Sequence, residues 1–215
     1  QLETNNQLYN HLVIAADPTG NDRIIAGALD AGSDTSFAAL VNGTWQDEVL
    51  DSNAKMTTNT GSAVLPVIAV AFEPTSGKGF FFFTETGQTS PRYVVWQPGT
   101  VGSKTPSTAS FGGNAIRNLQ AQGYSASASN EIWLAGENNR GTLMYAIWDG
   151  NAQTWSNGKR VVPSLAVTNT NGTNSRSNYS LGDGVMAYGR NDARIPYRLV
   201  QAGTNNWDSS DSFTP

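Results

Sequence analysis

The stretch Glu131–Trp155, EIWLAGENNRGTLMYAIWDGNAQTW, decides the fold. It predicts two strands, Glu131–Gly136 and Leu143–Trp148, which are separated by a polar turn and followed by a tight corner at Asp149-Gly150. Short runs of β-branched, aromatic and small residues, broken by Gly and Asn, are typical of a buried antiparallel meander. The chain is therefore expected to consist of antiparallel strands.

The same pattern occurs three more times. The aromatic residues that open the third strand of each unit follow one another at steps of 56, 52 and 52 residues, at Phe37, Tyr93, Tyr145 and Tyr197. The units cover approximately residues 1–56, 57–112, 113–167 and 168–215, within a single domain of residues 1–215. This regularity is the strongest indication of the architecture.

Four units of 52–56 residues, each with four antiparallel strands, predict an all-β fold of the β-propeller type, because the repeats of a stacked solenoid are usually shorter. Each meander has two apolar faces that it cannot bury alone, so neighbouring units are expected to pack face to face. Phe80–Phe83, which is apolar on both faces, fits a strand between two neighbouring sheets. The Trp and Tyr residues of the repeats are expected in the contacts between units.

Two arrangements of the four units remain open. We expect the units to close on themselves, because the chain begins and ends on repeat boundaries, with Gln1–Tyr9 pairing with the last sheet as a clasp. In the other arrangement, they form a segment of a larger ring that further sequence or a second copy completes.

Composition excludes several classes of function. The net charge of −4, with a pI near 4.9, disfavours nucleic acid as a partner, because proteins that bind it usually carry a basic patch. Cysteine is absent, so disulfides and thiolate metal sites are excluded. The longest apolar run, Ala63–Phe72, is too short to insert across a membrane.

Several segments resemble a repeat family of large exported bacterial proteins, whose tandem units read approximately AADP…D…W-DG-x-x-W. The segments are Ala15–Thr19, Val70–Gly77, Arg92–Trp96, Trp148–Gly150 and Thr154-Trp155. This resemblance covers nearly the whole chain and implies a propeller-like surface module. It carries no assigned activity.

The corner at Asp149-Gly150 with Thr154-Trp155 is also similar to the Asp-box of sialidase-like propellers, Ser-x-Asp-x-Gly-x-Thr-Trp. The leading Ser is absent here, Asn42 replaces the Asp in the first unit, and Val101 replaces the Trp in the second. The box is structural in that superfamily, so the similarity implies the fold rather than hydrolysis.

Candidate site residues lie in the turns that follow the second strand of each unit. In a propeller these turns share one rim, where several carboxylates would converge as glycoside hydrolysis requires and arginines would bind an anionic sugar. The carboxylates are Asp30, Asp34, Glu85, Glu137 and Asp192, and the arginines are Arg140, Arg190 and Arg194. Polar turns are also what any solvent-facing rim contains.

Catalytic and metal-binding equipment is otherwise sparse. His11 is the only histidine, and it precedes an apolar strand without partners for a triad or a metal cluster. The oxygen-rich loops Asp17–Asp22 and Asp30–Asp34 are possible Ca²⁺ ligands, although ordinary Asx-turns explain them as well. No other cofactor is expected.

The sequence supports a non-enzymatic, secreted or cell-surface β-propeller that uses its rim turns to bind a glycan or a protein. Adhesion, or self-assembly with further copies into a surface appendage, would suit such a module. The alternative is a sialidase-like glycoside hydrolase that uses carboxylates on the same rim.

Overall fold

The structure is a computed structural model. It describes residues 9–30, 35–51, 67–85, 89–97, 107–109, 111, 116–126, 128–138, 142–156, 158–162, 179–188, 197–200 and 211–212. All regular structure in these residues is β-strand, as the sequence predicts. The described part of the chain has no helix with the length and apolarity needed to cross a membrane.

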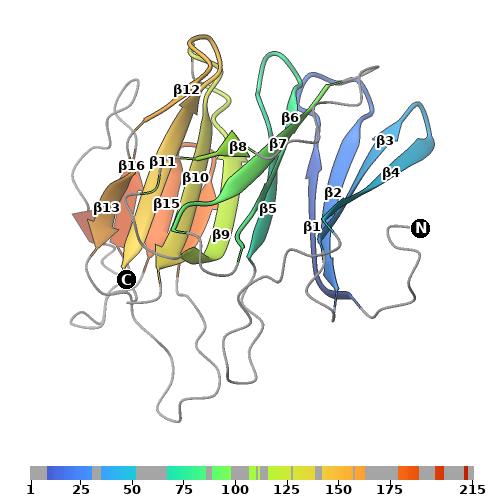
Figure 1. The fold of residues 1–215 in the computed structure, drawn as a ribbon. Helices are drawn as coiled ribbons and strands as arrows, with labels where there is room; N and C mark the ends of the chain where they lie inside the picture. The colour runs from blue at the N-terminus through green and yellow to red at the C-terminus, as the bar shows by residue number, and fades with distance from the viewer. Residues whose placement is uncertain are drawn as a thin grey trace.

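The strands form four small sheets, each in chain order (Figure 1). The first sheet contains β1 (Tyr9–Ala16), β2 (Ile24–Asp30), β3 (Thr35–Val41) and β4 (Thr44–Asp51). The second contains β5 (Ile68–Phe72), β6 (Gly79–Phe83), β7 (Arg92–Trp96) and β8 (Ser107–Thr108).

The third sheet contains β9 (Ile116–Gly123), β10 (Ile132–Asn138), β11 (Leu143–Asp149), β12 (Thr154–Trp155) and β13 (Lys159–Val162). The fourth contains β14 (Tyr179–Gly182), β15 (Val185–Tyr188), β16 (Tyr197–Val200) and β17 (Asp211–Ser212). All pairings are antiparallel.

The third sheet differs from the expected four strands. Its outer edge is divided, because β12 pairs with one end of β11 at Trp148 and Asp149, whereas β13 pairs with the other end at Leu143–Tyr145. The backbone N–H of Ser156 donates to the carbonyl of Ile147 at 2.8 Å, which holds the chain to β11 just after β12.

The hairpin between β3 and β4 follows from its sequence. Asn42 and Gly43 have φ angles of 51° and 75°, the pair of positive values that a two-residue type I′ turn requires and that Asn-Gly adopts readily. The short turn leaves β3 and β4 in register from Val41 opposite Thr44.

The sheets lie side by side in chain order, and their first strands approach one another. Contacts join β1 to β5, β5 to β9, and β9 to β14. The first strands of the sheets therefore lie next to one another, and the later strands of each sheet extend away from them (Figure 1). This is the arrangement of propeller blades around an axis.

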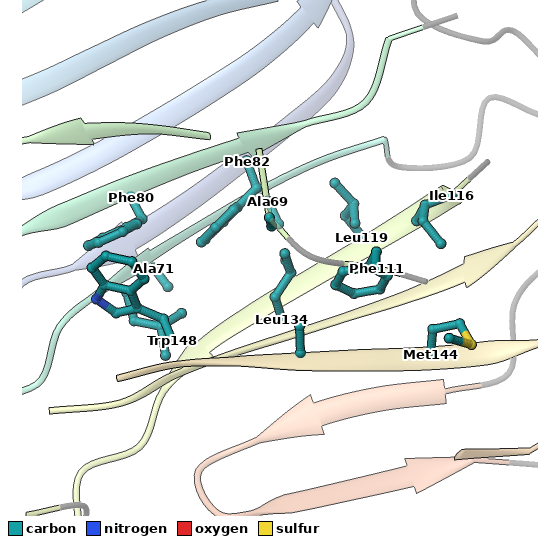
Figure 2. Close-up of a cluster of buried hydrophobic side chains, with 13 residues drawn as sticks. Ala69, Ala71, Phe80, Phe82, Phe111, Ile116, Leu119, Leu134, Met144 and Trp148 are labelled. Atoms are coloured by element: carbon teal, nitrogen blue, oxygen red, sulfur yellow. The ribbon is translucent and has the colours of Figure 1, made fainter. Parts of the chain in front are cut away.

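Apolar clusters fill the junctions between consecutive sheets. Alternation along β6 sends Phe81 and Phe83 into the junction with the first sheet and Phe80 and Phe82 into the junction with the third, where Figure 2 shows them near Trp148. The expectation that Phe80–Phe83 is buried on both faces is confirmed, since all four side chains are fully buried.

The junction between the third and fourth sheets is also aromatic. Trp133 and Tyr145 pack there in one cluster with Tyr179 and Tyr188. No cluster of described residues joins the fourth sheet to the first. The described sheets therefore form an open row rather than the closed ring that we expected, and the proposed clasp, Gln1–Tyr9, lies outside the described residues apart from Tyr9.

Substitution of Gly27 tests how closely the first two sheets approach. A Cβ atom at Gly27 would lie 2.2 Å from Cε2 of Phe81, whereas at Gly182 the nearest atom would be 3.8 Å away. We expect Gly27→Ala to lower the free energy of unfolding by about 1–3 kcal/mol through overpacking, measured by urea denaturation. Gly182→Ala is the matched control, and equal effects of the two substitutions would contradict this packing.

Candidate functional site

The structure describes few of the rim residues that the sequence singles out. Asp34, Arg140, Arg190, Asp192 and Arg194 lie outside the described residues. Asp30 ends β2, and its side chain is likewise not described. Their role in binding stays a prediction.

Glu85 follows β6, as expected for a turn residue. Its Oε2 lies 2.9 Å from Nε of Arg92, and both side chains are partly exposed. The carboxylate is thus engaged by an arginine of the next strand in the same sheet.

Glu137 is not in a solvent-facing turn, so that expectation is wrong. It lies within β10, opposite Leu143 and Asn118, and is only 2% exposed. Burial is the main cause that raises the pKa of Tyr179 well above its usual value, and the negative charge of Glu137 is the second. The Tyr179 hydroxyl donates to the carbonyl of Asn118 at 3.1 Å. Glu137 therefore belongs to the junction between the third and fourth sheets. The sequence placed it in a turn because polarity alone does not distinguish a strand end from a turn.

At the opposite ends of the strands, the hairpins between the first and second strands carry a set of polar contacts between sheets. Glu73 begins the hairpin of the second sheet and is fully buried. Its Oε1 accepts a hydrogen bond from Nε1 of Trp148 at 2.6 Å, and its Oε2 accepts from Nδ2 of Asn130 at 3.0 Å and from the hydroxyl of Ser76. The N–H of Thr75 donates to Oδ1 of Asn130 at 2.8 Å. One carboxylate thus connects the second sheet to the third.

Asp17 occupies the corresponding position in the first sheet. Its Oδ1 accepts from the N–H and hydroxyl of Thr19 at 2.9 and 2.7 Å, and Nε of Arg23 donates to its Oδ2 at 2.5 Å. Burial alone raises the pKa of Asp17, but these hydrogen bonds and the Arg23 charge outweigh it and hold the pKa below its usual value. The Arg23 guanidinium lies 6.0 Å from the centre of the Trp96 ring, in the second sheet.

Two sets of contacts connect the third and fourth sheets, one at the hairpins and one along the first strands. The N–H of Ser125 donates to Oδ1 of Asp183 at 2.8 Å, and its hydroxyl donates to Oδ2. Gln120 bridges the first strands of both sheets, since its Nε2 donates to the carbonyl of Tyr179 at 2.9 Å and its Oε1 accepts from the N–H of Leu181 at 2.8 Å. Hydrogen bonds therefore connect the second sheet to the third and the third sheet to the fourth, in addition to the apolar packing at these junctions.

These hairpins surround a cavity of about 390 Å³ that lies between the first strands of the first three sheets. The walls come from β1, β5 and β9 and from the hairpins that follow them, with Asp183 from the fourth sheet. The lining residues are Ile14, Ala15, Ala16, Pro18, Val70, Ala71, Phe72, Pro74, Ala121, Gln122, Gly123, Ser125 and Asp183. The sequence did not point to this site, because most of its residues are small or apolar and they come from four different units.

Most of the lining residues are small or apolar, three have polar side chains, Gln122, Ser125 and Asp183, and the exposed surface of the lining is about equally polar and apolar. Small-molecule sites are usually concave, about 300–1,000 Å³ in volume, and mostly apolar with a few placed polar groups. A neutral ligand with C–H faces and hydroxyl groups suits such a lining, because Gln122 offers a donor and an acceptor, whereas Ser125 and Asp183 already bind each other.

The described residues contain no group of three or more potential metal ligands of the His, Cys, Asp and Glu types. Asp17, from one of the two loops considered for Ca²⁺, is engaged by Thr19 and Arg23 instead. The side chains of the other loop, Asp30–Asp34, are not described. His11 lies half-buried in β1, and burial lowers its pKa.

No family model matches this chain, and no curated protein matches it. Solved structures share its fold. AofleA from Arthrobotrys oligospora is 12% identical, covers 94% of this chain with a TM-score of 0.57, and is itself covered over 56% of its length. The BP39L lectin from Burkholderia pseudomallei is 13% identical over 95% of this chain and 55% of its own, with a TM-score of 0.53.

The Aleuria aurantia lectin is 9% identical over 95% of this chain and 61% of its own, with a TM-score of 0.51. It is described as a six-bladed β-propeller with a novel fucose recognition mode. At these identities the similarity establishes the fold, which is that of β-propellers, and gives no support to the Asp-box resemblance. This chain spans between 55% and 61% of the length of the three proteins.

The Asp17 contacts generate a prediction about pH. A carboxyl group whose pKa is lower in the folded than in the unfolded chain stabilises the fold above its unfolded pKa, and this contribution is lost as the pH falls through the folded pKa. We expect wild type to exceed Asp17→Asn in free energy of unfolding at neutral pH, and the difference to shrink below about pH 4. Urea denaturation over this range measures it, and a difference that does not change with pH would contradict the role of the charge.

Proposed function

We propose that this chain is a non-enzymatic, carbohydrate-binding module of the β-propeller type. The observation that carries the proposal is the shared fold, which covers more than nine-tenths of this chain in comparison with two solved lectins. One fold can host many functions, so the proposal also depends on whether the site can bind a sugar.

The cavity between β1, β5 and β9 is the proposed binding site. Pro18, Pro74 and Ile14 offer apolar surface for the C–H groups of a sugar ring, and Gln122 offers hydrogen bonds to its hydroxyls. Gln122 is exposed, and its Nε2 donates only a 3.3 Å hydrogen bond to the carbonyl of Gly123. Its amide is therefore available to a ligand with little loss of internal contacts.

The described carboxylates favour binding over hydrolysis. Glycoside hydrolysis needs two carboxyl groups placed on either side of the scissile bond. Of the rim candidates with described side chains, Glu85 is in an ion pair with Arg92 and Glu137 is buried in a sheet junction. Neither is presented to a substrate as the hydrolase alternative requires.

Neutral sugars, with fucosides first, are the proposed ligand class, because the Aleuria aurantia lectin is described by its fucose recognition. We further propose that the module works outside the cell, secreted or on the cell surface, where glycans are presented. Adhesion to a glycan-bearing surface would follow from that location.

Glycan binding can be tested on a glycan array, followed by calorimetry with methyl glycosides that include methyl α-fucoside. We expect binding of at least one neutral glycan and roughly tenfold weaker binding by Gln122→Ala, because loss of one hydrogen bond to a ligand typically costs about 1 kcal/mol or more. Gln46→Ala removes a similarly exposed amide from β4, which β2 and β3 separate from the lining residues of β1, and is the matched control.

Failure of the folded protein to bind any glycan would contradict the function. Binding that Gln122→Ala leaves unchanged would retain the function and reject the cavity as its site.

A further inference from the structure

The edge of β5 that faces away from β6 carries main-chain groups that no described strand pairs. Within the described part of the chain, β5 pairs with β6 alone. In an antiparallel pair, the N–H and C=O groups of successive residues point alternately towards the partner strand and away from it. The N–H of Glu73 donates to the carbonyl of Lys78 at 2.9 Å, so Glu73 faces the second strand of its sheet. Val70 and Phe72 are an odd number of residues from Glu73, and their N–H and C=O groups therefore point away from β6.

These main-chain groups point towards the cavity. Val70 and Phe72 both line it. A Cβ atom at Gly123 would lie 2.3 Å from the carbonyl oxygen of Phe72, which shows that this carbonyl points from β5 towards β9. The exposed surface of the lining is about equally polar and apolar although only three of its side chains are polar, so main-chain groups supply part of its polarity. Such groups need hydrogen-bond partners other than a strand.

The fourth sheet shows how an edge of this kind is satisfied within the chain. The carbonyl of Tyr179 in β14 accepts a hydrogen bond from Nε2 of Gln120 at 2.9 Å. The N–H of Leu181 donates to Oε1 of the same Gln120 side chain at 2.8 Å. One amide from the third sheet thus pairs with a C=O group of β14 and with the N–H group two residues later.

The register identifies the same two groups in β5. The last residues that pair across the two hairpins before their turns are Gly182, at the end of β14, and Glu73, directly after β5. Counting back from these residues gives the equivalent positions, which are Tyr179 and Val70, and Leu181 and Phe72. The C=O of Val70 and the N–H of Phe72 therefore correspond to the pair that Gln120 binds in β14.

The first sheet has no amide at the position equivalent to Gln120. Gln120 lies three residues before Gly123, which pairs with the first residue of β10, and Val13 lies three residues before Ala16, which pairs with the first residue of β2. Val13 packs against the cluster that contains Phe72, as Gln120 lies against β14. The apolar side chain of Val13 cannot hydrogen-bond with the edge of β5, which is left to a ligand.

We propose that the C=O of Val70 and the N–H of Phe72 bind two adjacent hydroxyl groups of a sugar in the cavity. One hydroxyl donates to the carbonyl and its neighbour accepts from the N–H, so the pair of hydroxyls does what the amide of Gln120 does in β14. This inference rests on the proposed glycan binding and specifies which groups of the protein make the polar contacts. Because both main-chain groups are neutral, they select a ligand by the positions of its hydroxyls and not by charge.

Nuclear magnetic resonance of the isotope-labelled wild-type protein tests the contact without a substitution. The probes are methyl α-fucoside, methyl α-galactoside, methyl α-mannoside and the strongest ligand from the glycan array. We expect the amide signal of Phe72 to shift on binding, because its N–H gains a hydrogen bond. The N–H of Leu181 is already bound to Gln120, so its signal should not shift and is the internal control.

A sugar that binds while the Phe72 signal stays unchanged would overturn this inference and leave glycan binding intact. Failure of every glycan to bind would overturn the proposed function itself, and this inference with it.

Val13→Gln tests the same contact by supplying an amide within the chain. The new amide should occupy the C=O of Val70 and the N–H of Phe72 and weaken binding of the sugar at least about tenfold, measured by calorimetry. Val13→Leu adds bulk without an amide and is the matched control, with binding within about twofold of wild type. Equal affinities of the two variants, both shown to be folded by circular dichroism, would contradict the inference.

Deoxy analogues of the bound sugar identify the two hydroxyl groups. We expect loss of either hydroxyl of one adjacent pair to weaken binding by the wild type about tenfold. Val13→Gln should no longer distinguish these analogues from the parent sugar, because its own amide takes the place of the pair. Analogues that affect the wild type and Val13→Gln alike would show that the hydroxyls bind elsewhere and would overturn the inference.

Discussion

The second and third sheets of this protein each have two apolar faces, and the structure depends on covering them. The strand β6 shows the constraint most clearly, because its alternating phenylalanines enter two different clusters. Burial of one such side chain contributes about 1.5–3 kcal/mol. The sheet containing β6 can realise this contribution only with a sheet on either side, so the units cannot fold stably one at a time.

Polar contacts determine how the apolar faces are aligned. Glu73 connects the second sheet to Trp148 and Asn130 of the third, and Ser125 and Gln120 connect the third sheet to the fourth. The Glu73 and Ser125 contacts lie at the hairpins that surround the cavity. The position of the candidate site is therefore a consequence of the sheet packing, because its walls are the first strands of three sheets.

The sequence predicted the strands and their stacking because periodic patterns report on burial within one unit. The aromatic residues of β7, β10 and β11 lie in the junctions, as expected, and Asn42-Gly43 forms the expected turn. The sequence did not predict the burial of Glu137, which is polar but lies inside a junction. Nor did it predict the cavity or the role of Glu73, since both depend on side chains from different units meeting across a junction, and no local pattern records such meetings.

Amide hydrogen exchange in increasing denaturant tests the central claim, that neighbouring sheets stabilise one another. If the contacts of Phe80 and Phe82 with the third sheet hold the structure together, the protected amides of β6 and β10 should open in one cooperative step with a common free energy. Opening free energies that differ by more than about 1 kcal/mol between the two strands, with β6 exchanging while β10 stays protected, would show that the sheets are independent and would contradict this account.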